Sequence, residues 1–404
     1  MPNRSAAMGE VFRIFLRLGL TSFGGPIAHL GYFRREFVER RGWLDEETFA
    51  AIIAFCSVLP GPTSSQVGML IGLLRAGPGG AFGAWFGFTA PSAIAMTVIA
   101  LALHGLEGHG GITASGWFNG LLFGLSAAAA AVVTHAVLGL ARSLCTDRET
   151  KTIALGATIL AIVTAGSAGL GWLPIALGAV VGALFLRERS VDAAPAFPVR
   201  VPRTVALIAA TIFALVVAFL LVPQWLASPA VALLETIVRA GTLVFGGGHV
   251  VLPLLGDLVS NGLLTARDFF AGYGAVQAMP GPLFTFAAFI GAANASPLSG
   301  VLGALVATVA IFVPSFALIF ALAPVWDRLR TLPRAAGALS GANASVVGLL
   351  AGVLYYPILA SLGTHPGGIG IAIAAYALIA VWMFPPWVVV AVSALLGAFA
   401  GALG

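Results

Sequence analysis

The sequence predicts an all-α polytopic membrane protein. It is expected to consist of two inverted-topology repeats of about six hydrophobic segments each, with broken or re-entrant helices, joined by one linking helix. Three observations support this fold class: the composition, the length of the apolar runs, and an internal similarity at a spacing of about 220 residues. Of the 404 residues, 59% are hydrophobic and 9% are charged, whereas soluble domains carry roughly 25% charged residues. The composition therefore excludes an ordinary soluble enzyme.

The net charge of +5 and the pI near 9.8 raise the question of a nucleic-acid partner. Nearly all basic residues are arginines, with Lys151 the one lysine, and most lie in short gaps between apolar runs. This pattern marks the cytoplasmic loops of a membrane protein, so we expect a lipid bilayer and no nucleic acid as partner. Arg13 and Arg17 interrupt the first apolar stretch, which argues against a cleaved signal peptide and suits a multi-pass protein of the bacterial inner membrane.

Apolar runs follow one another along the whole chain, and an α-helix needs about 20 apolar residues to cross a hydrocarbon core of roughly 30 Å. Thirteen such segments are predicted, some of them short or interrupted by glycine or proline. They lie near residues 11–31, 48–74, 79–103, 116–141, 151–167, 170–186, 204–226, 230–256, 268–293, 299–323, 335–361, 366–383 and 385–403. The longest polar stretch, the Arg-rich 187–203, is predicted to be a cytoplasmic linker.

An internal repeat becomes visible when the chain is aligned with itself. At an offset of 222 residues the matches are Arg17, Gly19, Phe23, Gly24 and Gly25 with Arg239, Gly241, Phe245, Gly246 and Gly247. At an offset of 220 residues, Pro60-Gly61-Pro62 matches Pro280-Gly281-Pro282.

We expect a first repeat in residues 1–190, a linker and connecting helix in 191–229, and a second repeat in 230–404. Because an odd segment separates the copies, the second repeat has the opposite membrane orientation. Carriers built in this way place their substrate site near the midplane, between the repeats, where helices are broken.

Two pairs of segments contain helix breaks at equivalent places. The first pair carries Ser22-Phe23-Gly24-Gly25-Pro26 and Phe245-Gly246-Gly247-Gly248, where consecutive glycines allow positive φ. The second pair carries the two Pro-Gly-Pro motifs, which stop a helix. Broken backbone at membrane depth requires surrounding protein or a water-filled cavity, and helix N-termini suit an anion. The alternative is that the glycines only allow close helix packing and the prolines only kink the helices.

The arginines also bear on the topology. If all thirteen segments cross the membrane, the Arg-rich loop at 34–41 lies opposite nearly every other Arg-bearing loop. If the segments at 11–31 and 48–74 are instead re-entrant, this loop is cytoplasmic and their equivalents in the second repeat re-enter from the outer side, with Arg267 as an exception. The positive-inside rule favours the re-entrant version.

Charged side chains near the breaks are candidate substrate ligands. Arg17 and Arg239 precede the glycine breaks at equivalent positions, and guanidinium groups bind tetrahedral oxyanions in a fork geometry. The alternatives are an internal pair, as between Arg239 and Glu235 four residues earlier, and snorkelling of Arg17 to the interface. His249 is the candidate titrating group, because its ordinary pKa lies near 6.5, although a structural role fits equally well.

The predicted substrate-binding residues are Arg17, Arg239, Ser22, Phe23, Gly24, Gly25, Phe245, Gly246, Gly247, His249, Thr63, Ser64, Gln66, Gln277 and Thr285. The predicted hinge or broken-helix residues are Pro26, Pro60, Gly61, Pro62, Pro280, Gly281 and Pro282. The polar side chains either coordinate an anion or satisfy carbonyls freed by proline. Acidic residues are scarce in the segments, which favours an anion as cargo. No catalytic constellation, metal-ligand cluster or cofactor motif appears, so we expect neither an enzyme nor a cofactor.

The matched motifs resemble the chromate ion transporter family in its long, two-domain bacterial form. The residues that carry the resemblance are Phe23-Gly24-Gly25-Pro26, Gly42-Trp43-Leu44, Pro60-Gly61-Pro62, Phe245-Gly246-Gly247-Gly248-His249 and Met279-Pro280-Gly281-Pro282. The resemblance covers roughly residues 8–190 and 230–403. It implies a secondary transporter that exports chromate from the cytoplasm and confers chromate resistance, with sulfate as the related oxyanion. The second repeat carries Gly248-His249 where the first repeat carries Gly-Gly-Pro, which indicates that the two halves have diverged.

The expected mechanism is alternating access at a midplane site between the repeats, with the two arginines and the broken-helix N–H groups binding the dianion. Two other functions stay open: import of sulfate or another oxyanion on the same scaffold, and a non-transporting membrane protein such as a lipid scramblase. The coupling ion also stays open, as does a homodimer, because Gly-rich faces serve packing within a chain as well as between chains.

Overall fold

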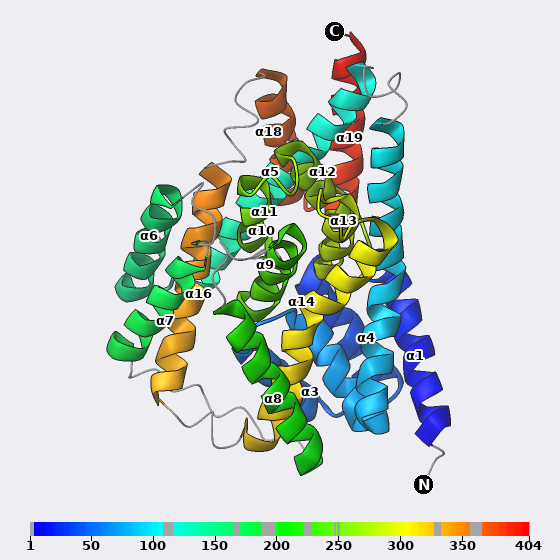
Figure 1. The fold of residues 1–404 in the computed structure, drawn as a ribbon, viewed down its shortest axis with the longest axis vertical. Coiled ribbons are helices and arrows are strands. Elements are labelled where there is room, and N and C mark those ends of the chain that lie inside the picture. The colour runs from blue at the N-terminus through cyan, green and yellow to red at the C-terminus, as the bar shows by residue number, and fades with distance from the viewer. Residues whose placement is uncertain are drawn as a thin grey trace.

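The computed structural model describes residues 4–107, 116–164, 170, 172–186, 199, 201–221, 228–245, 248, 251–326, 333–355 and 366–403, and every regular element in these ranges is helical. Up to residue 221 the helices are α1 (Arg4–Thr21), α2 (Gly25–Phe33), η1 (Arg34–Arg40), α3 (Glu46–Val58), α4 (Thr63–Glu107), α5 (Gly116–Leu144), α6 (Arg148–Val163), α7 (Leu173–Phe185) and α8 (Arg203–Leu220). The remaining helices are α9 (Pro229–Leu243), α10 (Val251–Leu255), α11 (Asp257–Ser260), α12 (Ala266–Gln277), η4 (Leu283–Thr285), α13 (Phe286–Ala293), α14 (Gly300–Leu322), η5 (Ala323–Val325), α16 (Pro333–Val353), α18 (Pro366–Ala380) and α19 (Pro386–Leu403) (Figure 1).

Within the described ranges, five helices are long and apolar enough to span a bilayer. They are Thr63–Gly105, Gly116–Leu144, Arg203–Leu220, Gly300–Val325 and Ala336–Val353. The other apolar helices are shorter, partly because each of the four segments predicted to carry a break is divided into two helices: α1 and α2, α3 and α4, α9 and α10, and α12 and α13. The chain is therefore an all-helical, multi-pass membrane protein with interrupted segments.

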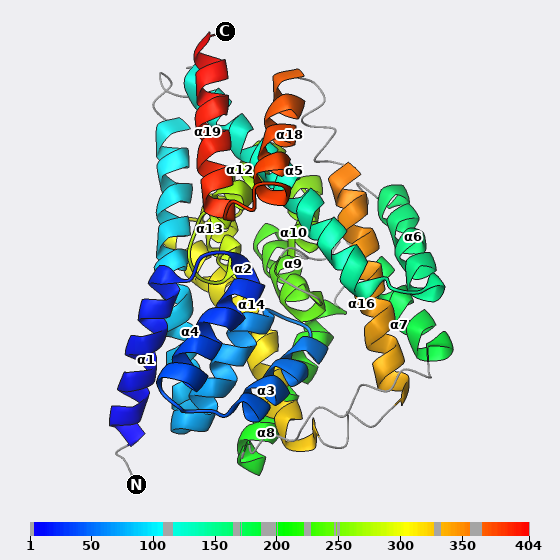
Figure 2. The same ribbon diagram turned by 180° about the vertical axis from the view of Figure 1, so that it is seen from behind.

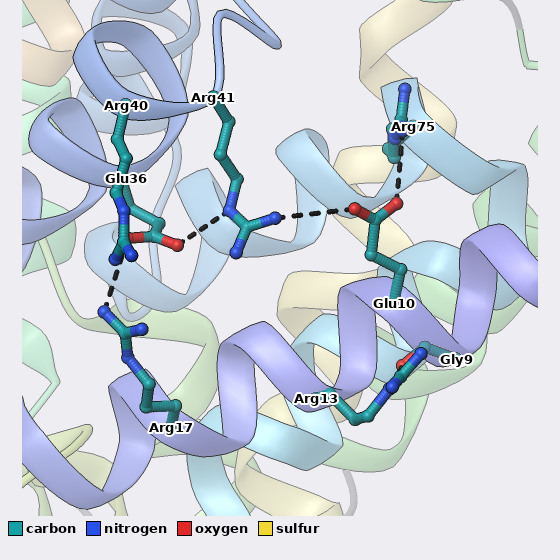
Figure 3. A network of polar contacts seen from close by, with 8 residues as sticks. All are labelled: Gly9, Glu10, Arg13, Arg17, Glu36, Arg40, Arg41 and Arg75. Atoms are coloured by element: carbon teal, nitrogen blue, oxygen red, sulfur yellow. Dashed lines mark hydrogen bonds and ion pairs between the residues drawn. The ribbon is translucent and has the colours of Figure 1, made fainter.

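Both broken segments of the first repeat enter and leave at the same end of the molecule. Glu10, near the start of α1, forms ion pairs with Arg41, which follows η1, and with Arg75, beside the kink in α4, at 3.4 and 3.1 Å. Figure 3 shows these side chains next to one another. The chain therefore turns back at 22–24 and again at 59–62, and the structure has the re-entrant arrangement that the arginine distribution favours.

The second repeat turns back in the same way, from the opposite end. The loop after α11 meets the end of α13, where the amide of Ala295 donates to the carbonyl of Leu263 at 2.9 Å. In Figures 1 and 2, α1 and α3 occupy the lower part of the molecule, whereas α10, α11 and α12 lie above them. The two repeats are thus inverted relative to each other, as predicted.

Equivalent glycines bring the first helix of each repeat against the long helix of the same repeat. A Cβ atom at Gly19 of α1 would lie 2.7 Å from the carbonyl oxygen of Phe88 in α4. A Cβ atom at Gly241 of α9 would overlap the carbonyl oxygen of Ile311 in α14. Around these pairs, α5 packs on α18 and α19, and α16 packs on α6 and α7. The outer helices therefore frame the broken ones.

Candidate functional site

The helix breaks of the two repeats meet crosswise in the interior. The amide of Gly61, in the first Pro-Gly-Pro motif, donates to the carbonyl of Val244 at the glycine break of the second repeat, at 2.6 Å. The amide of Gly281, in the second Pro-Gly-Pro motif, donates to the carbonyl of Ser22 at the glycine break of the first repeat, at 2.9 Å. These bonds join equivalent positions, so each proline motif holds the glycine break of the other repeat.

The central residue of each Pro-Gly-Pro motif has to be glycine. The φ angle is +122° at Gly61 and +90° at Gly281, a region that L side chains rarely adopt. A Cβ atom at Gly281 would lie 2.9 Å from the hydroxyl oxygen of Ser92, and one at Gly61 would overlap the hydroxyl of Ser315. Pro91-Ser92 and Pro314-Ser315 match in the internal repeat. Both crossings therefore have the same arrangement, in which the glycine of a Pro-Gly-Pro motif lies against a serine of the other repeat.

The crossing at Ser22 contains a buried histidine. His29 lies with Nε2 3.2 Å from the carbonyl oxygen of Ser22 and Nδ1 3.1 Å from the hydroxyl oxygen of Ser64. Ser22 and Ser64 belong to the predicted site, and the structure brings them together through His29. His29 lies near the first break in the sequence but was not selected for the predicted site, because it is two residues out of register with His249.

The crossing at Val244 is held by a glutamine. The side-chain nitrogen of Gln66 donates to the carbonyl of Pro60 at 2.7 Å and to the hydroxyl of Ser315 at 3.4 Å. Gln66 belongs to the predicted site, and its hydrogen bond to Pro60 satisfies a carbonyl of the first Pro-Gly-Pro motif. Ser315 was missed, although the repeated Pro-Ser pair pointed to it.

Two helices of the first repeat begin at the breaks. α2 begins at Gly25 and α4 begins at Thr63, and the contact of His29 with Ser64 places the middle of α2 beside the first turn of α4. Helix N-termini carry free N–H groups and a partial positive charge. In the described part of the chain, buried polar atoms without a hydrogen-bond partner also gather near the breaks: the hydroxyls of Ser22 and Ser65, Oε1 of Gln66 and Nε2 of Gln277. The hydroxyls and the Gln277 amide nitrogen are donors that suit an oxyanion, whereas Oε1 of Gln66 can only accept a hydrogen bond.

The other predicted residues of the breaks are distributed as follows. Gly24 and Gly25 have positive φ, +102° and +77°, as expected for a glycine break. The Phe23 ring lies 6.3 Å from that of Trp387 in α19. Pro26 occupies the first turn of α2, where its missing N–H is tolerated. Phe245 is half-buried, and Gly246, Gly247 and His249 lie outside the described residues.

Around the second proline motif, the predicted polar residues contact their own repeat. The Thr285 hydroxyl donates to the carbonyl of Pro282 at 2.9 Å, and Gln277 interacts with the buried Tyr273. These contacts match the reading in which polar side chains satisfy groups freed by proline. Thr63 is half-buried at the start of α4.

Both arginines of the predicted site are paired with carboxylates. Arg239 is buried and forms an ion pair with Glu235, as the spacing suggested, and its guanidinium lies 5.8 Å from the ring centroid of Trp172. Arg17 has 56% of its side chain exposed and lies 3.5 Å from Glu36. Internal pairing, one of the two alternatives to substrate binding, is therefore present at both positions.

Glu36 is the centre of the ionic network in Figure 3. Its buried carboxylate lies 2.7 Å from Arg41, 3.3 Å from Arg40 and 3.5 Å from Arg17. Burial raises the pKa of this carboxyl, but the hydrogen bond from Arg41 and the charges of Arg41, Arg17 and Arg40 outweigh it and hold the pKa below its ordinary value. Sequence reasoning missed Glu36, which lies 19 residues from Arg17.

The family model described as chromate transporter matches the chain twice, over residues 9–234 and 231–398. The chain belongs to the chromate transporter family. A chromate transport protein of Pseudomonas aeruginosa is 31% identical over 84% of this chain and 79% of its own length. A probable chromate transport protein of Synechococcus elongatus is 27% identical (86% and 84% covered), and a chromate transport protein of Cupriavidus metallidurans is 25% identical (85% and 81% covered). No solved structure matches the chain.

Membership in this family makes the chain a transporter rather than an enzyme. The two matches cover the two halves whose breaks meet crosswise, and they agree with the two-repeat architecture. Among the described residues, no group of three or more His, Cys, Asp or Glu side chains could hold a metal ion.

Proposed function

We propose that this chromate transporter is a secondary carrier that moves chromate out of the cytoplasm by alternating access, and that it confers chromate resistance in this way. The observation that carries the proposal is the pair of crosswise hydrogen bonds, Gly61 to Val244 and Gly281 to Ser22. Broken helices of inverted repeats that meet in the interior are typical of carriers whose substrate site lies between the repeats.

The proposed binding site lies at the crossing, between the N-termini of α2 and α4 and the buried hydroxyl and amide groups near the breaks. A tetrahedral dianion accepts hydrogen bonds from N–H and O–H donors and is favoured by helix N-termini. Ser22, Ser64 and Gln66 contribute polar groups to this interior. The prolines on both sides of Gly61 and Gly281 keep the breaks stiff while the repeats move.

Arg17 and Arg239 are proposed to meet the anion on its way to and from the site. Each is held by a carboxylate, Glu36 in one repeat and Glu235 in the other. A dianion can take the place of the carboxylate because it presents the same fork of oxygen atoms to the guanidinium. When the dianion replaces the carboxylate as the partner of the arginine, one end of the substrate path opens.

The membrane potential favours export of an anion. An inside-negative potential contributes about 2.3 kcal/mol per charge per 100 mV, and thus about 4.6 kcal/mol for a dianion. The proposal places the protein in the bacterial inner membrane with the Arg-rich linker 187–203 in the cytoplasm. Residues 1–190 and 230–404 then act as the two moving repeats, joined through 191–229.

The test is flux of radiolabelled chromate into liposomes that contain the purified protein, at an imposed potential with and without a pH gradient. We expect saturable flux that follows the potential and that sulfate inhibits; stronger transport of sulfate than of chromate would instead indicate a sulfate carrier. Arg17→Ala and Arg239→Ala should lower the flux at least tenfold. Arg13→Ala is the matched control, because Arg13 is exposed on the same helix and donates to the carbonyl of Gly9. Absence of flux under every gradient contradicts the proposal.

A further inference from the structure

His29 occupies the crossing of the two repeats, and no step proposed above uses it. The residue is 1% exposed and lies on α2, about one turn after the glycine break. Its ring nitrogens contact the Ser22 carbonyl at 3.2 Å and the Ser64 hydroxyl at 3.1 Å, and its ring meets that of Phe88 edge-on with centroids 5.1 Å apart. A polar side chain buried to this extent and bonded at both ends has a defined orientation.

The partners of the ring determine its protonation. The Ser22 carbonyl can only accept a hydrogen bond, so Nε2 carries the proton. Nδ1 then accepts the hydrogen bond that the Ser64 hydroxyl donates. In the described part of the chain, the polar and ring contacts of His29 are with Ser22, Ser64 and Phe88, and none of these groups is charged. A buried imidazole in such surroundings is neutral. His29 is therefore a neutral bridge with one tautomer.

The bridge joins three parts of the crossing. The Ser22 carbonyl that accepts from His29 also accepts from the amide of Gly281 in the second repeat. Ser64 belongs to the first turn of α4, directly after the first Pro-Gly-Pro motif. His29 thus connects both breaks of the first repeat to the proline motif of the second. The equivalent position in the second repeat is Val251, whose side chain cannot make these hydrogen bonds.

We propose that His29 is a positioning residue of the oxyanion site: by holding the Ser22 carbonyl and the Ser64 hydroxyl, it fixes the N-termini of α2 and α4, whose N–H groups bind the dianion, and it does so without titrating. This inference rests on the proposed function, because it assigns His29 a task at that same site. It predicts that His29 acts on the affinity for chromate, through geometry, at every pH at which the carrier works.

Two conservative substitutions separate the two hydrogen bonds. His29→Gln places a donor nitrogen near the position of Nε2 and keeps the contact with Ser22, whereas His29→Asn places an acceptor near the position of Nδ1 and keeps the contact with Ser64. A neutral hydrogen bond contributes about 0.5–1.5 kcal/mol, or roughly two- to tenfold. Each variant should therefore raise the KM for chromate by about two- to tenfold, and His29→Ala should raise it more than either.

A double-mutant cycle identifies the partner. Ser64→Ala removes the same hydrogen bond as His29→Gln, so the double variant should have the KM of the single ones. Ser64→Ala combined with His29→Asn removes both bonds and should approach His29→Ala. His104→Gln, at an exposed position of α4, is the control and should keep the wild-type KM. A purely structural role would lower the amount of folded protein and the maximal flux, and leave KM unchanged in the protein that remains.

A second readout does not depend on transport. ¹⁵N NMR of histidine-labelled full-length protein in detergent, with His29→Gln to assign the signal, should show a neutral Nε2–H tautomer from pH 6 to 8. A His29 that titrates in this range, or wild-type KM in all three His29 variants, overturns the inference. Absence of chromate flux in the wild type overturns the proposed function instead, and the NMR signal then still decides the state of the bridge.

Discussion

The amide of Gly61 and the carbonyl of Val244 are joined by a hydrogen bond of 2.6 Å, although they belong to different repeats. The equivalent pair, Gly281 and Ser22, is joined at 2.9 Å. Each repeat thus supplies the donor at one crossing and the acceptor at the other. In the proposed alternating-access cycle, a rotation of one repeat against the other would act on both bonds at once and so couple the opening of one end to the closing of the other.

The first prediction concerns the glycines of the proline motifs. Gly61→Ala and Gly281→Ala should abolish chromate flux, because each forces a side chain into positive φ, at a cost of about 1–3 kcal/mol, and against a serine of the other repeat. Gly77→Ala is the matched control: its φ of +70° imposes similar strain, but nothing lies within 4 Å of the added Cβ atom. Equal loss of flux in all three variants would contradict a special role of the crossings.

The second prediction separates stability from transport at Arg239. Arg239→Ala should lower the free energy of unfolding by about 3–5 kcal/mol, because it leaves the buried Glu235 without its ion pair. Removing Glu235 as well should restore most of the stability but none of the flux. Thermal unfolding in detergent and liposome flux measure the two effects. Recovery of flux in the double variant would show that Arg239 acts only as the partner of Glu235.

The third prediction concerns the pH dependence of the network at Glu36. Glu36→Gln should destabilise the protein at pH 7 by about 1.5–3 kcal/mol, the contribution of hydrogen bonds to a charged group, because three arginines surround the carboxylate. The pKa of Glu36 is lower in the folded protein than in the unfolded chain, so its contribution is complete above the unfolded pKa, near 4.3. The contribution is lost as the pH falls through the lower folded-state pKa.

Thermal unfolding of wild type and Glu36→Gln from pH 7 to pH 3 measures this contribution. The difference between the two proteins should stay constant down to about pH 5 and should shrink below it. Glu47→Gln, at an exposed position of α3, is the control and should leave the unfolding curve of the wild type nearly unchanged. A difference that grows on acidification would contradict the assignment of Glu36 as a charged hub.

The fourth prediction concerns helix packing. Gly241→Ala should destabilise the protein and lower its yield, because the added Cβ atom would overlap the backbone of Ile311, which cannot move aside as a side chain can. Gly9→Ala, with open space around the added Cβ atom, should instead stabilise α1 by up to about 1 kcal/mol. Thermal unfolding of both variants provides the comparison, and a neutral Gly241→Ala would show that α9 and α14 can separate at this point.

Much of this architecture follows from local patterns. The breaks at Gly24, Gly25 and in the Pro-Gly-Pro motifs were predictable, because consecutive glycines and paired prolines act on their own backbone. The ion pair of Arg239 with Glu235 was predictable for the same reason, since four residues bring two side chains together on one helix. The inversion of the repeats followed from counting segments.

The contacts between repeats could not be predicted. Nothing in the sequence states that Gly61 meets Val244, because the pairing depends on how two folded units pack. Glu36 escaped attention since it lies in η1, in the Arg-rich loop after the first broken segment, rather than one turn from Arg17. His29 was not selected because the self-alignment pairs it with Val251. A functional residue that is present in only one of two repeats has no matching residue in the other repeat to indicate its role.

The crosswise contact has a consequence for the ancestry of the chain. In a two-fold homodimer every contact between residues i and j occurs twice, once in each direction. Gly61 with Val244 and Gly281 with Ser22 have this form when the equivalent residues of the two repeats are exchanged. A single repeat that inserted into the membrane in both orientations would form a dimer in which this hydrogen bond occurs twice. Fusion of two such repeats into one polypeptide would preserve both hydrogen bonds. Each half would then be free to acquire its own side chains.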